Sequence, residues 1–161
     1  MRLRMFALLL ATTAFAACNG DYLPADPSLT GSWESTWSTG PRPFPGGART
    51  VNEFTQVYFG DNHAFQRVRY LVDTNQVTII DQIDQGTFTA QGGTVWARVD
   101  HSYARGAGEP LDNPIPQSVD RTDEYRYSVN GDALTLSPQC PPNASCIEPV
   151  ITVYGRLRPI D

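Results

Sequence analysis

Short runs of alternating apolar and polar residues, separated by turn-forming residues, fill the chain from Thr30 onward. An apolar side chain at every second position predicts a β-strand with one face toward a core, and no stretch keeps the 3.6-residue period of an amphipathic helix. The expected strands span residues 32–37, 51–59, 63–72, 77–81, 86–91, 94–103, 122–129, 133–137 and 150–157.

Several of these strands are joined by very short connections, such as Gly60-Asp61-Asn62, Gly92-Gly93 and Asn130-Gly131-Asp132. Asn and Gly tolerate the positive φ of hairpin turns, so consecutive strands are expected to pair antiparallel. About eight to ten such strands can close on themselves and remove their edges. The sequence therefore predicts an all-β fold, a single antiparallel up-and-down barrel.

The alternation also predicts which side chains point into the barrel. The expected inner face is mostly apolar and consists of Phe88, Ala90, Val95, Ala97, Val99, His101, Tyr103, Tyr125, Tyr127, Val129, Leu134, Leu136, Ile151 and Val153. A small barrel is either filled by its own side chains or holds one small ligand, and the strand count does not decide between the two.

Two long connections stand out, residues 38–49 and 105–120. Loops longer than about a dozen residues are uncommon unless they are functional or disordered, so both are candidates for recognition. The alternative is that both are mobile surface loops.

The first seventeen residues form a segment apart from the barrel. Arg2 and Arg4 precede an apolar stretch, residues 5–15, which has the length of a signal peptide and is too short for a permanent transmembrane helix. Residues 1–17 are therefore expected to be an export signal, residues 18–29 a tether and residues 30–161 the barrel domain.

Ala16-Ala17-Cys18, at the end of the apolar stretch, resembles a bacterial lipoprotein signal. The resemblance implies that Cys18 is lipidated and anchors the mature chain in a membrane. Asn19, rather than Asp, follows the cysteine, and by the same resemblance the periplasmic face of the outer membrane is the expected location. The alternative is ordinary secretion with cleavage close to Ala17.

Cys140 and Cys146 are the other two cysteines, and five residues rich in turn formers lie between them. Exported proteins meet an oxidising environment in which disulfides persist, so these two are expected to pair while Cys18 carries the lipid. A redox pair or a soft-metal site is the alternative, although the spacing is not C-x-x-C and no histidine lies nearby.

The charge balance excludes some partners. Without Arg2 and Arg4 the chain keeps ten basic residues against seventeen acidic ones, a formal charge of −7. Nucleic-acid binding or a polybasic contact with a membrane surface would require the opposite sign.

Gly31-Ser32-Trp33 resembles the G-x-W opening of the lipocalin and wider calycin barrels, and the hairpin sequences FGDN (59–62), GTF (86–88) and YSVNGDALTL (127–136) are similar to those of bacterial lipocalin-like domains. The resemblance implies that Trp33 packs at the closed end of the barrel, with Arg156 or Arg158 from the last strand across its indole. It also implies that residues 38–49 fold over the open end as a lid.

Motifs that carry chemistry are sparse. The sequence lacks G-x-S-x-G, H-E-x-x-H, a P-loop and a dinucleotide fingerprint. Asp100-His101-Ser102 has the residue types of a catalytic triad, but neighbours on a strand point to opposite faces. His101 is interpreted as a half-buried strand residue, His63 as a residue beside a turn, and Asn143-Ala144-Ser145 as a chance match to a glycosylation acceptor.

The acidic residues Asp73, Asp81 and Asp84 lack the alternating spacing of a calcium loop and are interpreted as parts of a solvated turn.

The expected protein is a lipid-anchored, non-enzymatic barrel without a cofactor or a metal. Its first candidate role is to bind or carry a small apolar ligand. The alternative is an envelope-structural or protein-interaction module, including a protease-inhibitor-like role, that uses the long loops and no ligand in the lumen. An uncharacterised hydrolase is a third alternative, for which the sequence offers no clustered acid, base and nucleophile.

Overall fold

The computed structural model describes residues 25–44, 46–105, 117–140 and 150–158. These residues form eight strands: β1 (Gly31–Phe44), β2 (Gly47–Phe59), β3 (Ala64–Asp73), β4 (Thr78–Gln91), β5 (Thr94–Ala104), β6 (Gln117–Asn130), β7 (Ala133–Pro138) and β8 (Thr152–Arg156).

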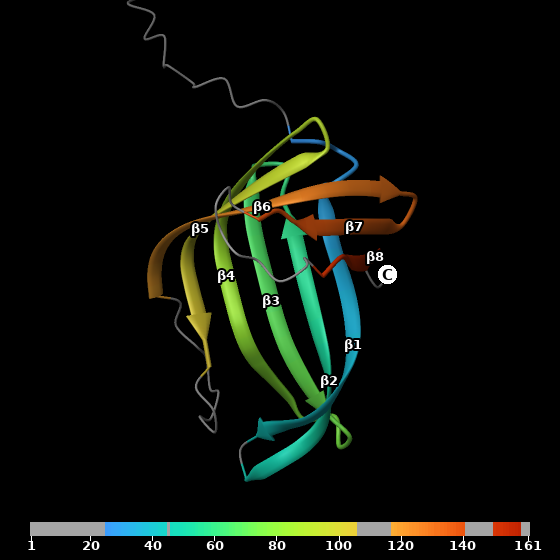
Figure 1. Ribbon diagram of the computed structural model, residues 1–161, viewed down its shortest axis with the longest axis vertical. Helices are drawn as coiled ribbons and strands as arrows, with labels where there is room; N and C mark the ends of the chain where they lie inside the picture. The colour runs from blue at the N-terminus through green and yellow to red at the C-terminus, as the bar shows by residue number, and fades with distance from the viewer. Residues whose placement is uncertain (1–24, 45, 106–116, 141–149, 159–161) are drawn as a thin grey trace, which may run out of the picture.

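Each strand pairs antiparallel with the next, and β8 pairs with β1, so the sheet closes into a barrel in sequence order (Figure 1). The prediction of a single antiparallel up-and-down barrel is confirmed. Within the described ranges there is no helix long and apolar enough to cross a membrane.

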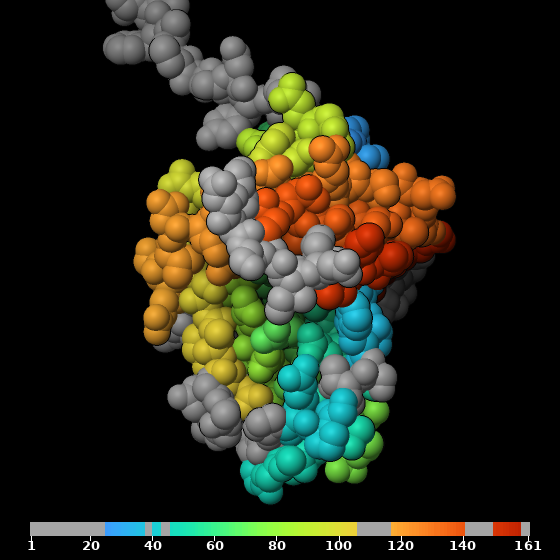
Figure 2. All heavy atoms as spheres, viewed as in Figure 1, coloured from blue at the N-terminus to red at the C-terminus, as the bar shows by residue number. Residues whose placement is uncertain are grey.

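The strands have unequal lengths, and this gives the barrel two different ends. β7 and β8 have six and five residues, whereas β1 and β6 have fourteen each. β6, β7 and β8 cross the upper part of the molecule in Figures 1 and 2, and the hairpin of β1 and β2 extends below them.

The predicted loop at residues 38–49 is wrong. β1 continues to Phe44 and β2 begins at Gly47, so most of this segment is a β-hairpin that extends the barrel wall. The ladder shifts register between Ser38 and Pro41 and then continues to the Phe44–Gly47 pair. Prolines are tolerated there because β8 pairs with β1 only at Trp33 and Glu34, which leaves this part of β1 at an edge among the described residues.

The two predicted strands 77–81 and 86–91 are one continuous strand, β4. Its pairing with β3 shifts between Arg69 and Tyr70, which face Gln82 and Ile80, so Asp81 is an extra residue in the ladder. The polar residues between the two predicted strands are therefore part of one bulged strand.

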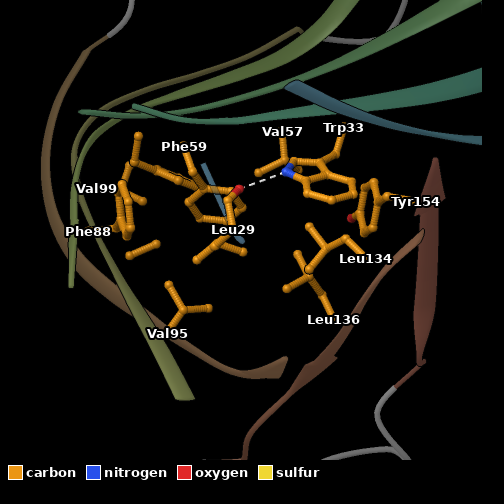
Figure 3. Packing of buried hydrophobic residues seen from close by; sticks show 12 residues of the cluster. Leu29, Trp33, Val57, Phe59, Phe88, Val95, Val99, Leu134, Leu136 and Tyr154 are labelled. Carbon is orange, nitrogen blue, oxygen red and sulfur yellow. Dashed lines mark hydrogen bonds between the residues drawn. The ribbon is translucent and has the colours of Figure 1, made fainter. Parts of the chain in front are cut away.

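Apolar side chains fill the upper end of the barrel, as the alternation predicted for Phe88, Val95, Ala97, Val99, Leu134 and Leu136. The core contains these six residues with Leu29, Trp33, Val57, Phe59, Phe65 and Tyr154, and each is less than 9% exposed. Figure 3 shows Leu29 in the middle of this cluster.

The chain before β1 belongs to the packed domain. Leu29 is fully buried, and the carboxylate of Asp26 accepts a 2.6 Å hydrogen bond from the hydroxyl of Tyr127. The domain therefore begins before residue 30, inside the segment that the sequence assigned to the tether.

Two inward-facing predictions on the last strand are wrong. Ile151 and Val153 are 60% and 61% exposed. Tyr154 instead pairs with the buried Leu134 and is itself buried. The inward positions are therefore Thr152 and Tyr154. A shift of one residue is enough to exchange the two faces of a strand.

A bulge also turns His101 outward, against the prediction. Val99 faces Gly86 and His101 faces Gln85, so Asp100 is the extra residue. Beyond the bulge His101 is exposed, and Ser102 takes the inward position, where its Oγ donates a 2.5 Å hydrogen bond to Asp84. Tyr103, one position further, points outward with its partner Ile83.

Gly86 permits this bulge, because a Cβ there would lie 1.9 Å from the carbonyl oxygen of Arg98. Gly86→Ala is therefore expected to lower the free energy of unfolding by about 2 kcal/mol or more, since backbone must move to relieve the overlap. Gly40→Ala is the control, because a Cβ at Gly40 has open space around it. Urea denaturation measures both variants, and equal stability of Gly86→Ala and the unmodified protein would contradict this account of the bulge.

Candidate functional site

A layer of charged and polar side chains lies in the barrel between two apolar clusters. The inward residues of β3 show the sequence of layers: Phe65 belongs to the upper core, Arg67 and Arg69 follow, and Leu71 belongs to a small lower cluster with Val51 and Ile79. β2 and β4 repeat the pattern with Glu53 and Thr55 and with Gln82 and Asp84.

Arg67 is the centre of this polar layer, and all three of its guanidinium nitrogens are occupied. Nε and Nη2 donate to Oδ2 of Asp84 at 3.0 and 2.5 Å, and Nη1 donates to the hydroxyl of Tyr125 at 2.5 Å. Nη2 also lies 3.2 Å from Asp123. The network joins β3, β4 and β6 across the lumen.

Asp84 is fully buried and has several hydrogen-bond donors besides Arg67. Ser102 donates to its Oδ1, and the side-chain amide of Gln82 donates to Oδ2 at 3.0 Å. Arg121 lies 3.3 Å away as a second cation. A buried carboxylate is tolerated only with such partners.

The network fixes the charge state of its members. Burial would raise the pKa of Asp84, but the hydrogen bond from Ser102 and the charge of Arg67 outweigh it and lower that pKa below the usual value. Burial likewise opposes the charge of Arg67, yet Tyr125, Asp84 and Asp123 raise its pKa. Burial raises the pKa of Tyr125 to about 12. These three groups therefore do not exchange protons near neutral pH.

The interpretation of Asp73, Asp81 and Asp84 as a solvated turn is wrong. Asp73 is 2% exposed: its Oδ1 accepts from the backbone N–H groups of Asn75 and Val77, and its Oδ2 accepts from Arg49 at 2.5 Å. Asp81 pairs with Arg69 and lies 3.5 Å from Arg105. Of these three residues, only Asp73 lies beside a turn, and its carboxylate stabilises that turn by accepting the backbone hydrogen bonds.

A cavity of about 300 Å³ opens beside the polar layer. Strands from both sides of the barrel form its wall. Its lining consists of Glu53, Thr55, Arg67, Arg69, Gln82, Tyr125, Leu136, Pro138, Thr152 and Tyr154. The wall from β2, β3 and β4 is polar, whereas the wall from β6, β7 and β8 contributes two tyrosines, a leucine, a proline and a threonine.

Only Tyr125 and Leu136 of this site were predicted from the sequence, as inward positions. A signal was present: Arg67 and Arg69 stand at alternate positions between Phe65 and Leu71, the spacing of one strand face. A charged pair at inward positions indicates a polar layer inside a barrel.

The two histidines lie apart from the cavity. The ring of His63 lies 5.7 Å from that of Phe88, and its Nδ1 is 3.2 Å from the carbonyl oxygen of Phe88. His101 is exposed on the outside of β5. In the described part of the chain, no three His, Cys, Asp or Glu residues are grouped to hold a metal ion.

Trp33 is fully buried at the upper end of the barrel, and Arg156 lies across its indole, 4.0 Å from guanidinium carbon to ring centroid. The indole N–H donates to the carbonyl oxygen of Leu29 at 2.8 Å (Figure 3). Gly31 leaves room for the arginine, since a Cβ there would lie 3.0 Å from Nη1 of Arg156. Of the two arginines that the sequence offered, Arg158 instead pairs with Asp132 at the surface.

Several predictions concern residues outside the described ranges. Cys18, Cys146 and Asn143 lie there, as do residues 106–116 of the second predicted loop, whose last four residues begin β6. Lipidation and the pairing of Cys140 with Cys146 therefore stay predictions.

Comparison with known proteins gives no relative of this chain. No protein-family model matches it, and neither a curated protein nor a solved structure shows a significant match. The cavity and the sequence signals are therefore the basis on which a function can be proposed.

Asp84→Asn is expected to lower the free energy of unfolding at pH 7 by about 3 kcal/mol, because it leaves the buried Arg67 short of a counter-charge. The folded state lowers the pKa of Asp84, so its ionic stabilisation is present above the ordinary aspartate value of 3.8 and is lost as the pH falls through the lower, folded value. The stability gap between the two proteins should therefore narrow below about pH 4.

Urea denaturation at pH 7, 4 and 3 measures this gap. Asp132→Asn is the matched control, because the side chain of Asp132 is 55% exposed and its pair with Arg158 is a surface pair. A gap for Asp84→Asn that stays constant from pH 7 to pH 3 would contradict the assigned ionic role.

Proposed function

We propose that this chain is a lipid-anchored envelope protein whose barrel binds one small ligand in the cavity beside the polar layer. The single observation that carries the proposal is the cavity itself: about 300 Å³ of space, lined from both sides of the lumen, in a barrel whose other end is packed. Small barrels either fill this space or hold one ligand, and here part of it stays open.

The geometry narrows the kind of ligand that the sequence suggested. The apolar part of the lumen is occupied by the protein's own side chains, with Leu29, Trp33, Phe59 and Phe88 at most 1% exposed. A wholly apolar guest would lie against Arg67, Arg69 and Glu53 in the remaining space. A small amphipathic ligand fits better, with its polar end toward β3 and its apolar body toward Tyr125 and Tyr154.

The chemistry of the polar layer supports binding rather than catalysis. A general acid or base works best with a pKa near the operating pH. Asp84, Arg67 and Tyr125 have pKa values displaced away from neutrality, and their contacts are mutual. Such a network holds side chains in fixed positions, which is what a binding site requires.

The position of the domain is consistent with a short lipid tether. Ala25, where the described structure begins, follows Cys18 by seven residues. Even a fully extended chain of that length reaches only ~25 Å, so a lipid on Cys18 would hold the barrel close to its membrane.

Filling the cavity tests the ligand proposal. Thr152→Phe adds a ring at a cavity-lining position, while Thr135→Phe adds the same ring on the outer face of β7, beside the exposed Val153. Native mass spectrometry of gently extracted protein should show an additional bound mass for the unmodified protein and for Thr135→Phe, and none for Thr152→Phe. Circular dichroism checks that both variants keep the barrel, and an unmodified protein that is always recovered empty would refute the proposal.

Cys18→Ser tests the anchor. The variant is expected to leave the membrane fraction and to lose the acyl chains from its mature mass, because only the cysteine thiol accepts the lipid. Cys140→Ser is the control and should keep both properties. Membrane retention of Cys18→Ser without any acyl mass in the unmodified protein would show that the lipoprotein assignment is wrong.

A further inference from the structure

Arg67 and Arg69 occupy equivalent inward positions on β3 and both line the cavity, yet their contacts differ. Every guanidinium nitrogen of Arg67 is bound. Arg69 places Nε at 2.8 Å and Nη2 at 2.5 Å from the same oxygen of Asp81. Among the described residues, no acceptor contacts its Nη1, and 39% of the Arg69 side chain is exposed.

Arg69 also stands between two other polar lining residues. Thr55 of β2 is directly opposite Arg69 on one side, and Gln82 of β4 is directly opposite on the other. Residues directly opposite in a ladder share a face, with about 5 Å between their Cβ atoms. Thr55 and Arg69 therefore contribute a hydroxyl and a guanidinium group to one wall of the cavity.

Ion pairs balance the charges of the lining residues. Arg67 and Arg69 are the positive lining residues, and Glu53 is the one acidic lining residue. Nη2 of Arg42 lies 3.4 Å from the Glu53 carboxylate and offsets its charge. Asp84 and Asp123 likewise offset the charge of Arg67, and Asp81 offsets that of Arg69, so an anion is favoured by the remaining N–H donors of Arg69 and not by a net positive charge.

We propose that the ligand is a small organic acid, whose carboxylate binds Nη1 of Arg69 and the hydroxyl of Thr55, and whose apolar body lies against Tyr125, Leu136 and Tyr154. Guanidinium groups suit carboxylates because their N–H donors form charge-assisted hydrogen bonds in a fixed plane. This inference rests on the proposed ligand-binding function and adds the class of ligand.

Three probes share a phenyl ring and a similar chain length and differ in their polar group: phenylacetate, 2-phenylethanol and 2-phenylethylamine. Their affinities show how much the polar group contributes to binding. Isothermal titration calorimetry uses the full chain in lipid nanodiscs, with empty nanodiscs as the blank. Phenylacetate should bind about tenfold more tightly than the alcohol, and the amine more weakly than either.

Arg69→Gln should weaken phenylacetate binding about tenfold and leave the alcohol nearly unchanged. Arg69→Lys keeps the charge but loses the planar donors, so it should retain only part of the preference for the acid. Arg98→Gln is the matched control, because the side chain of Arg98 is 64% exposed and does not line the cavity. Thermal unfolding of each variant checks that the barrel is intact.

The outcomes separate this inference from the function on which it rests. Equal binding of acid and alcohol would overturn the assignment to an organic acid, and an acid preference that persists in Arg69→Gln would overturn the assignment of its carboxylate to Arg69. Either result would leave a ligand-binding cavity in place. Failure of all three probes would overturn the assignment to an organic acid as well, and a bound mass recovered with the purified protein would then show that the cavity binds another class.

Discussion

Closure of the barrel depends on one short seam, where β8 meets β1 through only two register pairs, Trp33 with Arg156 and Glu34 with Gly155. The Arg156 side chain reinforces this seam from the side of the indole and donates to the carbonyl oxygens of Ser28 and Thr30 at 2.9 Å. The cation–π contact contributes about 1 kcal/mol, but the hydrogen bonds also hold the chain before β1 in place. Leu29 enters the core from that segment, so the packed end and the closed sheet depend on the same arginine.

The rest of the lumen has to satisfy charges that the strands bring inside. Arg67 and Asp84 meet because their positions are directly opposite in the β3–β4 ladder, and the same ladder places Arg69 opposite Gln82. Desolvation of such a pair costs several kcal/mol, and only mutual hydrogen bonds offset it. The bulge at Asp100 places Ser102 inward and opposite Asp84, and the bulge at Asp81 lets Ile79 face inward in the lower cluster. The irregular pairing of β4 therefore serves the polar layer.

Much of the fold could be predicted from the sequence, because strand alternation and turn residues are local signals. Val95, Ala97 and Val99 were assigned to the core in this way, and Trp33 was assigned to the closed end from a two-residue motif. The resemblance also named Arg156, although it could not choose between that residue and Arg158. That choice depends on register, which places Arg156 directly opposite Trp33.

The candidate site was largely missed, in part because the partners in its polar layer depend on where the ladders slip. The single extra residue Asp100 exchanged the faces of His101 and Ser102, and the sequence contains no mark of that exchange beyond Gly86 on the neighbouring strand. The hairpin of β1 and β2 was hidden for a related reason: prolines and glycines indicate a loop, but an edge strand accepts them. Asp84 was assigned to solvent because a carboxylate is usually exposed, and only its partners on β3, β5 and β6 make burial possible.

Arg67 and Arg69 differ in how many of their guanidinium nitrogens are bound, and this difference would allow one lumen to be stable and also to bind a ligand. Two arginines in the lumen with complete sets of partners would leave no free donor for a ligand, and two with incomplete sets would destabilise the barrel. Arg67 has Asp84, Asp123 and Tyr125, whereas Arg69 has one oxygen of Asp81 and keeps contact with the cavity. The short strands β7 and β8 leave that cavity unfilled, with Leu136 and Tyr154 as its apolar wall. In the proposed function, Arg67 thus serves stability, and Arg69, two positions along the same strand, serves recognition.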